Sequence, residues 1–586
     1  MSKSVTGNAF DLGLFKRILK YVLPYKGVFY LTSFLTFVLA ALAPIRPIII
    51  QYTLDKSIIT PNKELLFNLT ILMVGILIIE TLVQFYQTYL ANWLGQTVIK
   101  DIRMKVYKTI SSFKLKYFDK TAIGTLVTRT ISDIETIAEI FSDGVLIIFG
   151  DLLKLVVVIG VMFYTDWKLA LFSLSSIPIL IVATNMFKNY IKLAFQDVRT
   201  QVARLNAFVQ EHITGMNIVQ IFNREEEELE KFNAINEKHK QAHIKTVLAN
   251  SIFFPVVEIL SALSLALLVW WGSSEVLAGT VTFGGLVAFI LYIYMLFRPI
   301  RQLADRFNVL QMGMVASERV FNVLDTEAHI ENNASVSAEK IKGDIKFDDV
   351  WFGYKEDDFV LKGISLEAKQ GETIALVGST GAGKTSVINL LSRFYEFQKG
   401  DIYIDNQNLR DFELGSLRKN IGVVLQDVFL FSDTIFNNIT LNDPNIILEE
   451  VIEAAKIVGA HDFIMKLPDN YHYSVGERGS VLSVGQRQLL AFIRAYVYNP
   501  KILVLDEATS SVDTESEELI QNAIEKLTAG RTSIVIAHRL ATIQKASTIM
   551  VMQKGKIVER GNHQELLKQN GQYKKLYELQ FENVME

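Results

Sequence analysis

Gly378-Ser379-Thr380-Gly381-Ala382-Gly383-Lys384-Thr385 is a complete G-x-x-x-x-G-K-[ST] loop. It follows an apolar, strand-like run at 373–377 and precedes a helical run that begins at Ser386. Glycines let successive N–H groups point at phosphate oxygens, and the helix N-terminus adds partial positive charge. Lys384 is placed for the β- and γ-phosphates and the Thr385 hydroxyl for Mg²⁺. The stretch, called the phosphate loop below, therefore predicts a site for a nucleoside triphosphate.

The composition of the whole chain limits the class of protein it can be. Half of the 586 residues are hydrophobic, and the mean hydropathy of +0.26 is high for a soluble enzyme. The net charge of −3 gives no electrostatic argument for nucleic acid as a partner. Cysteine is absent, which excludes disulfides, thiolate catalysis and cysteine metal sites. No secretory signal pattern precedes Lys20, so we expect no cleaved leader.

The apolar residues are concentrated in the first half, where six stretches approach or exceed the roughly 20 residues that cross a bilayer. We expect spans at 28–51, 66–95, 141–163, 169–187, 249–272 and 281–300. A cluster of basic residues follows the second span, which is typical of the cytoplasmic side. Six crossings then predict a multi-pass protein of the cell (inner) membrane, with both termini and the phosphate loop in the cytoplasm.

The segments between the spans suggest how the chain is organised. Residues 11–22 read as an amphipathic helix on the membrane surface, within an N-terminal elbow at 1–27. The polar segments 96–140 and 188–248 are too long for loops, so we expect the spans to continue as helices into the cytoplasm, turn and return. A short helix at each turn could dock on the nucleotide domain. We therefore expect a helical membrane domain at 28–310, a linker at 311–342 and an α/β nucleotide domain at 343–586.

A second chemical motif lies downstream of the phosphate loop. The apolar run 502–505 ends in Asp506 and Glu507. Asp506 can hold Mg²⁺, directly or through water, and Glu507 can polarise an attacking water beside the γ-phosphate. Two carboxylates after an apolar strand are a weak signal alone, but they are a strong one in the same domain as a phosphate loop.

The order of the remaining motifs identifies a family resemblance. Leu482-Ser483-Val484-Gly485-Gln486 precedes the strand with Asp506 and Glu507, and Ser511-Val512-Asp513 and Ile536-Ala537-His538-Arg539 follow it. In this order the motifs resemble those of the ATP-binding cassette (ABC) family. With six spans before the cassette, nearly the whole chain resembles an ABC exporter half-transporter.

The resemblance implies roles for individual residues around ATP and Mg²⁺. Tyr354 matches the aromatic residue that stacks on adenine, and Gln426 the glutamine that touches Mg²⁺ or water. Glu507 matches the catalytic base, and His538 the switch histidine at the γ-phosphate. The residues that match those facing the partner subunit's ATP, or the seam between subunits, are Ser483, Gly485, Gln486 and Asp513.

One residue departs from the family pattern and bears on the partner. Position 484 is usually glycine in the family and is valine here, which disfavours positive φ and adds bulk beside the phosphate. If Val484 has negative φ, a homodimer has two working sites. If the signature is weakened, the partner is a different half-transporter. The intact Lys384, Glu507 and His538 beside an altered signature favour the heterodimer, and one cassette per chain requires a second half in either case.

Ionisable and aromatic residues within the expected spans bear on the cargo. Ionisable groups within the expected spans are suspects for function: Glu80, Asp151, Lys154, Glu258 and Arg46. The alternative is that Asp151 and Lys154 form an internal pair and that Arg46 reaches the interface. A stripe of Phe289, Tyr292 and Leu296 is more typical of packing than of a cavity. We expect export of a hydrophobic or amphipathic drug or lipid; peptide export, or an ATP-gated or regulatory half, is the alternative.

Overall fold

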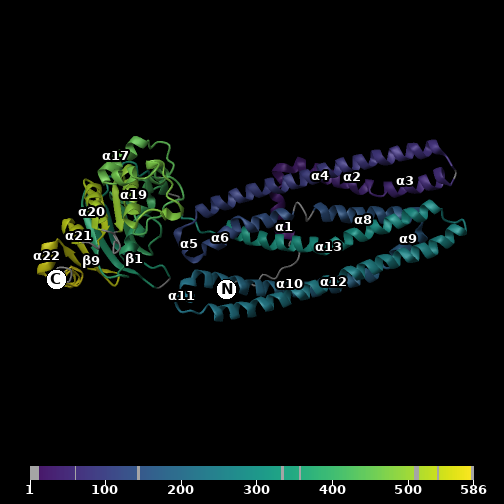
Figure 1. The fold of residues 1–586 in the computed structure, drawn as a ribbon. Helices are drawn as coiled ribbons and strands as arrows, with labels where there is room; N and C mark the ends of the chain where they lie inside the picture. Colours follow the sequence, from purple (N-terminus) through teal and green to yellow (C-terminus); the bar gives the residue numbers. More distant parts are fainter. Residues whose placement is uncertain are drawn as a thin grey trace. The chain divides into compact units, whose positions relative to one another are not determined.

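The computed structural model describes residues 12–59, 61–140, 146–330, 336–355, 358–506, 514–537 and 540–581. The chain divides into two compact units (Figure 1). One consists of Met1–Ser111 and Ile123–Glu327, and the other of Ser112–Ala122 and Ala328–Glu586. We call them the helical unit and the nucleotide unit.

Helices form the described part of the helical unit, because long apolar runs with few internal glycines or prolines satisfy their backbone groups locally. In chain order they are α1 (Leu12–Lys20), η1 (Leu23–Tyr25), α2 (Lys26–Leu42), α3 (Ile45–Thr53), η2 (Leu54–Ile58), α4 (Lys63–Ser111), α6 (Ile123–Thr130), α7 (Ser132–Glu139), α8 (Leu146–Thr165), α9 (Trp167–Leu174), α10 (Ile177–Thr214), α11 (Met216–Ile221), α12 (Glu225–Leu277) and α13 (Phe283–Leu324).

Five helical segments are long and apolar enough to cross a membrane. They are Leu23–Ile58, Lys63–Ser111, Ile147–Thr165, Trp167–Thr214 and Glu225–Leu277. They correspond to the first five predicted spans. The sixth prediction is confirmed only as a helix, because the apolar part of α13, Phe283–Pro299, is shorter than the other five.

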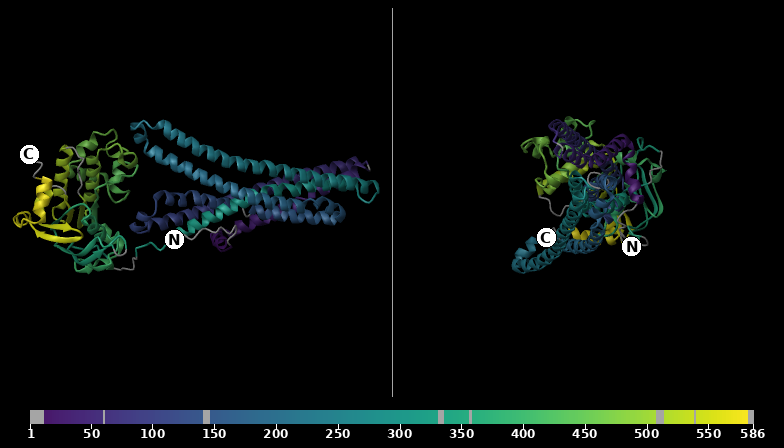
Figure 2. Two further views of the ribbon diagram at one scale, coloured as in Figure 1. Left: turned by 90° about the horizontal axis from the view of Figure 1, so that it is seen from below. Right: turned by 90° about the vertical axis from the view of Figure 1, so that its right-hand side faces the viewer.

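The polar segments continue the membrane helices, as expected. α4 has 49 residues and α12 has 53, so at about 1.5 Å per residue each is roughly 70–80 Å long. That exceeds the ~30 Å hydrocarbon core of a bilayer more than twofold. α10 and α12 lie side by side and are joined through α11 (Figures 1 and 2). The turn expected within the polar segment 188–248 lies at Gly215, between α10 and α11.

The helices at the two ends of the helical unit bear on two expectations. On α1, assigned above to the membrane surface, Ile18 and, just after the helix, Val22 are buried in a cluster with residues of α4, α7 and α13. The segment 311–342, assigned to a linker, is helical as far as Leu324, and the helical unit ends at Glu327.

The nucleotide unit contains two sheets. An antiparallel sheet has the order β2-β1-β4-β5, with β1 (Ile345–Phe352), β2 (Leu361–Ala368), β4 (Lys399–Ile404) and β5 (Gln407–Asn408). The larger sheet has the order β10-β9-β3-β8-β7-β6. Its strands β3 (Thr373–Val377), β6 (Ile421–Val424), β7 (Ile502–Asp506), β8 (Thr532–Ile536) and β9 (Thr548–Gln553) are parallel, and β10 (Lys556–Gly561) is antiparallel to β9.

Helices and short turns complete the nucleotide unit (Figure 1). They are α5 (Leu115–Lys120), α14 (Lys384–Leu391), η4 (Leu409–Asp411), α15 (Leu414–Lys419), α16 (Ile435–Thr440), α17 (Leu448–Val458), α18 (His461–Met465), η5 (Asn470–His472), η6 (Glu477–Gly479), α19 (Val484–Val497), α20 (Thr514–Thr528), α21 (Leu540–Lys545), α22 (His563–Lys568) and α23 (Gln572–Phe581).

The central strand β3 is buried on both faces, which explains its unbroken apolar sequence. Ala375 and Val377 belong to one hydrophobic cluster, and Ile374 and Leu376 to the other. Alternate residues of β3 therefore contribute to two hydrophobic cores. The phosphate loop follows this strand at the carboxyl edge of the sheet. The predicted α/β fold of this half is confirmed.

The first of the two predicted turn helices, α5, packs within the nucleotide unit. The Lys114 amide donates to the Ala328 carbonyl at 2.8 Å, and the Tyr395 hydroxyl donates to the Asp119 carboxylate. The Phe113 ring lies 5.2 Å from the His329 ring. These contacts join α5 to the segment that enters the cassette and to the loop after α14.

Candidate nucleotide site

The phosphate loop uses its glycines where other residues would not fit. Gly381 and Gly383 have φ of +81° and +103°, a region that L side chains rarely adopt. A Cβ on Gly378 would lie 2.3 Å from the Met552 carbonyl oxygen. The loop can therefore curl tightly against β9 before α14 begins at Lys384. Its tip, Ser379 and Thr380, is exposed.

The Lys384 ammonium folds back onto the backbone of the phosphate loop. Its Nζ donates to the carbonyl oxygens of Gly378 at 2.7 Å and Ser379 at 3.2 Å, and the residue is buried. Burial lowers the pKa of Lys384, and the nearby Asp506 carboxylate opposes that shift. The loop thus holds a largely desolvated ammonium, whose attraction to anions is strengthened by its low-dielectric surroundings.

Asp506 approaches the loop from β7. It is the last residue of that strand and is buried. Burial raises the pKa of Asp506, while the nearby Lys384 ammonium and Thr385 hydroxyl lower it and Asp427 raises it further. Thr385 and Asp506 together offer hydroxyl and carboxylate oxygens, the donor types that Mg²⁺ prefers.

The parallel strands explain why residues distant in sequence converge here. β3, β8, β7 and β6 are neighbours and run in one direction, so their carboxyl ends lie at one sheet edge. The exposed Gln426 follows β6 by two residues. Asp427, beside it, acts on Asp506 and was missed by the sequence analysis. A carboxylate just after a parallel strand was the signal that could have found it.

Tyr354 follows β1 by two residues. Its hydroxyl contacts α14, the helix that follows the phosphate loop. Its hydroxyl lies 3.1 Å from the Ser386 Oγ and accepts from the Asn389 Nδ2 at 3.1 Å, so α14 fixes the ring. The ring meets Phe352 and Tyr395 edge to face, at 4.8 and 5.1 Å between centroids. An aromatic at the predicted adenine position is therefore tied to the phosphate loop.

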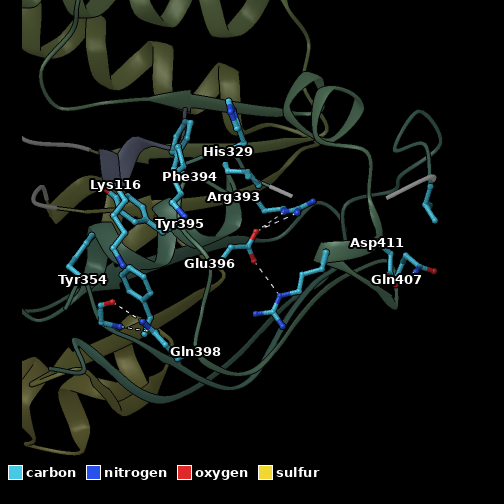
Figure 3. Close-up of a pocket in the computed structure, with 16 residues that line it drawn as sticks. Lys116, His329, Tyr354, Arg393, Phe394, Tyr395, Glu396, Gln398, Gln407 and Asp411 are labelled. Carbon is cyan, nitrogen blue, oxygen red and sulfur yellow. Dashed lines mark hydrogen bonds and ion pairs between the residues drawn. The ribbon is translucent and has the colours of Figure 1, made fainter. Parts of the chain in front are cut away.

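A cavity of about 770 Å³ lies beside Tyr354 (Figure 3). Glu396 pairs there with Arg393 at 3.4 Å and with Arg410 at 3.3 Å. Lys116, from α5, contributes to the same wall. No phosphate-loop residue lines this cavity, so it is the groove next to α5 and not the phosphate site.

The predicted signature begins α19 with a reciprocal cap, as its sequence indicated. The Ser483 Oγ accepts from the Gln486 amide at 3.2 Å, and the Gln486 Oε1 accepts from the Ser483 amide at 2.9 Å. Val484 is the first residue of the helix. Its φ is negative, and its side chain is 44 % exposed. Gly485 behind it is buried. Valine is therefore compatible with the backbone of the signature.

Three predicted site residues, Glu507, Asp513 and His538, lie outside the described residues. In the sequence, Glu507 directly follows the last residue of β7, and His538 follows the last residue of β8 by two positions.

The charged residues of the membrane spans pair differently from the alternative considered above. Asp151 pairs with Arg306 at 3.6 Å, and Arg46 pairs with Glu80 at 3.2 Å. Helical spacing placed Asp151 and Lys154 on one face but could not foresee the arginine on α13. Glu258 is exposed on α12.

The predicted aromatic stripe on α13 is a packing face, as favoured above. Phe289, Tyr292 and Leu296 are fully or almost fully buried in one cluster with residues of α8, α9, α10 and α12. The Tyr292 hydroxyl is buried with no hydrogen-bond partner within the described part of the chain.

Comparison with known proteins shows the family of each region. Residues 29–300 match the model of the ABC transporter transmembrane region, and residues 361–510 match that of the ABC transporter family. The chain therefore belongs to the ABC transporter family, with its membrane and ATPase regions fused as in an exporter half-transporter. It is a membrane protein that binds ATP and couples its hydrolysis to transport.

Relatives match over almost the full chain. The chain is 38 % identical over 588 residues to the uncharacterized ABC transporter ATP-binding protein YknV of Bacillus subtilis, covering 100 % of this chain and 97 % of that protein. It is 35 % identical to the ATP-dependent lipid A-core flippase of Syntrophus aciditrophicus, covering 97 % and 95 %. It is also 35 % identical to the putative multidrug export ATP-binding/permease protein YgaD of Bacillus subtilis, covering 97 % and 100 %.

Proposed function

We propose that this chain is one half of an ATP-driven exporter of hydrophobic or amphipathic molecules. The observation that carries the proposal is the grouping of Thr385 and Asp506 with a buried Lys384, in an ATPase unit fused to membrane-length helices. Relatives named as a lipid flippase and a multidrug exporter support this class of cargo. A peptide or other specific cargo, or a gating or regulatory role, is the alternative carried from the sequence.

The proposed roles follow the positions at the sheet edge. Tyr354 stacks on adenine, the phosphate loop 378–385 wraps the phosphates, and Lys384 contacts the β- and γ-phosphates. Thr385, Asp506 and Gln426 would hold Mg²⁺, which supplies charge neutralisation when bound. Glu507 orients the attacking water, and His538 contacts the γ-phosphate.

The partner is a second half-transporter. In the proposed arrangement, Ser483, Gly485, Gln486 and Asp513 face the ATP held by the other subunit. The exposed Val484 side chain beside the Ser483 cap adds bulk at the phosphate-facing end of α19 and favours a heterodimer with one impaired ATP site. The negative φ of Val484 favours the second candidate, a homodimer with two working sites.

We place the protein in the cell (inner) membrane, with the nucleotide unit and both termini in the cytoplasm. The lysines and arginines along the polar half of α4 support this orientation. Protease added outside sealed cells should leave the nucleotide unit intact, and cleavage there would contradict the orientation.

The experiment is ATP-dependent movement of a fluorescent amphiphile in vesicles that contain the purified chain, alone and with a candidate partner. Glu507→Gln should retain ATP binding and abolish movement. Vesicles that hydrolyse ATP with every candidate partner but move no amphiphile would refute the proposed export. Measuring the mass and ATPase activity of the chain alone separates the homodimer from the heterodimer.

A further inference from the structure

A groove in the helical unit combines apolar walls with an excess of positive charge. It has a volume of about 600 Å³ and is lined mainly by one face of α10 and one face of α13. Its charged lining residues are Lys188, Lys192, Arg199, Arg319 and Asp133. Four cations against one carboxylate are unusual for a cavity that is otherwise substantially hydrophobic, because like charges gathered in a hollow repel one another.

The single carboxylate of the lining is already shared by two arginines. Asp133 already pairs with Arg129 on the neighbouring α6 and with Arg319 at 3.6 Å. Lys192 and Arg199 are exposed and have no ion pair within the described part of the chain. They lie seven residues apart, two helical turns, so both face the same side of α10. The groove therefore presents a cationic strip that an anion could neutralise.

The rest of the lining suits a hydrocarbon chain. Phe195 and Met312 are 40 % and 43 % exposed, and Phe187 stacks on Phe253 with 4.0 Å between ring centroids. Large side chains on opposing helices thus leave apolar surface open beside the cations. A soluble anion would gain nothing from these walls, whereas an amphiphile would bury its chain there.

The position of the groove fits a ligand taken from a bilayer leaflet. Lys188 follows the predicted fourth span, 169–187, directly, and the remaining cations on α10 continue into its polar extension. Basic pockets between membrane helices on the cytoplasmic side are suited to anionic lipid headgroups.

We propose that the groove between α10 and α13 binds an anionic amphiphile, with its phosphate or carboxylate headgroup on Lys192 and Arg199 and its chain along Phe195 and Met312. This inference rests on the proposed export function and names the class of cargo: single- or double-chain molecules with an acidic headgroup. The groove then selects cargo by charge before the ATPase cycle acts.

The test measures binding without ATP or transport. The full chain, in nanodiscs of phosphatidylcholine, is titrated with fluorescent lysophosphatidylglycerol and with fluorescent lysophosphatidylcholine of the same chain and dye. We expect at least about tenfold tighter binding of the anionic probe at low salt, and a smaller ratio at high salt. Glycerol phosphate, which has the headgroup charge without the chain, should not compete.

The variants locate the effect. Lys192→Gln with Arg199→Gln should bring the two probes to nearly equal affinity, and the double Glu variant should reverse the preference. Lys100→Gln with Lys108→Gln, two exposed lysines on α4, is the matched control and should keep the wild-type ratio. Size-exclusion profiles and melting temperatures establish that each variant is folded.

Three results would overturn the inference: equal binding of both probes by the wild type, full competition by glycerol phosphate, or an equal loss in the control pair. Its failure is separable from that of export. Transport of a neutral amphiphile without any charge preference would refute the groove and leave export standing. A charge preference in a protein that moves no amphiphile would support the groove and refute export.

Discussion

The Thr385 hydroxyl, at the end of the phosphate loop, lies near enough to the carboxylate of Asp506, at the end of β7, to oppose the rise of its pKa. The two residues are far apart in sequence, and they meet because β7 and β3 each pair in parallel with β8. The fold itself brings a hydroxyl and a carboxylate together beside a buried ammonium. The cost of bringing these groups together is therefore met by folding, and pre-organisation of this kind favours tight binding of a charged ligand.

Asp506→Asn is expected to lower Mg²⁺-dependent ATP hydrolysis on the order of 100-fold or more, because it removes the proposed carboxylate donor to the metal. The rate is measured as a function of Mg²⁺ concentration. Asp427→Asn is the control, since Asp427 influences Asp506 only through its charge, and a much smaller loss is expected there. An Asp506→Asn protein that hydrolyses ATP at the wild-type rate would contradict the metal assignment.

Asp506→Asn should also change how the stability of the nucleotide unit depends on pH. Burial raises the pKa of Asp506 above its ordinary value, so the folded unit binds this proton more tightly than the unfolded chain does. The stability from this group is present at low pH and is lost as the pH rises through the folded-state pKa. Asp506→Asn should remove that part of the pH dependence, and its melting temperature at neutral pH should equal or exceed that of the wild type.

Tyr354 offers a test of the adenine position. Tyr354→Ala should weaken binding of a fluorescent ATP analogue about threefold to tenfold through lost stacking. Tyr354→Phe keeps the ring but loses the contacts to Ser386 and Asn389, so a loss smaller than that of the alanine variant is expected. Equal affinities for all three proteins would place adenine elsewhere.

Val484 distinguishes the two kinds of dimer. Val484→Gly removes the half-exposed side chain next to the Ser483 cap without changing a residue that donates to phosphate. If bulk impairs the signature, ATP turnover by the assembled transporter should rise several-fold. Unchanged turnover would favour the homodimer. Ser483→Ala, which removes a cap worth about 1 kcal/mol, should lower turnover in either case.

Tyr292 allows a measurement of stability in the helical unit. Its hydroxyl is buried without a partner among the described residues, so Tyr292→Phe should leave the free energy of unfolding unchanged or raise it by up to about 1 kcal/mol. Tyr292→Ala should cost about 3–5 kcal/mol through the cavity it opens. Thermal unfolding in one detergent compares them. A clear loss of stability in Tyr292→Phe would reveal a partner for the hydroxyl.

The sequence predicted best where the determinants are local. The strand before the phosphate loop and the helix after it depend on neighbouring residues, and the structure has both. The pair of Asp151 with Arg306 was not predicted, because Arg306 comes from a helix about 150 positions away. The anchoring of Tyr354 by Asn389 joins the end of β1 to α14 and depends on how these elements pack, which no local pattern in the chain encodes.

The contact between Tyr395 and Asp119 gives the last prediction. Burial and the hydrogen bond to Asp119 raise the pKa of Tyr395, so the hydroxyl stays a donor throughout the physiological range. Because Asp119 belongs to α5, this bond ties a turn between membrane helices to the loop after α14. Tyr395→Phe should leave basal ATP hydrolysis within about twofold and reduce its stimulation by an amphiphile, since stimulation requires the turn and the cassette to move together.

Asp119→Asn is the matched variant for this contact. It keeps a hydrogen-bond acceptor for the Tyr395 hydroxyl but removes the charge, so it should retain more of the stimulation than Tyr395→Phe. Stimulation is measured as the ratio of ATPase rates with and without amphiphile, in the same vesicles. If both variants are stimulated as strongly as the wild type, the bond holds α5 in place without transmitting the cargo signal, and transmission must use the Phe113–His329 and Lys114–Ala328 contacts instead.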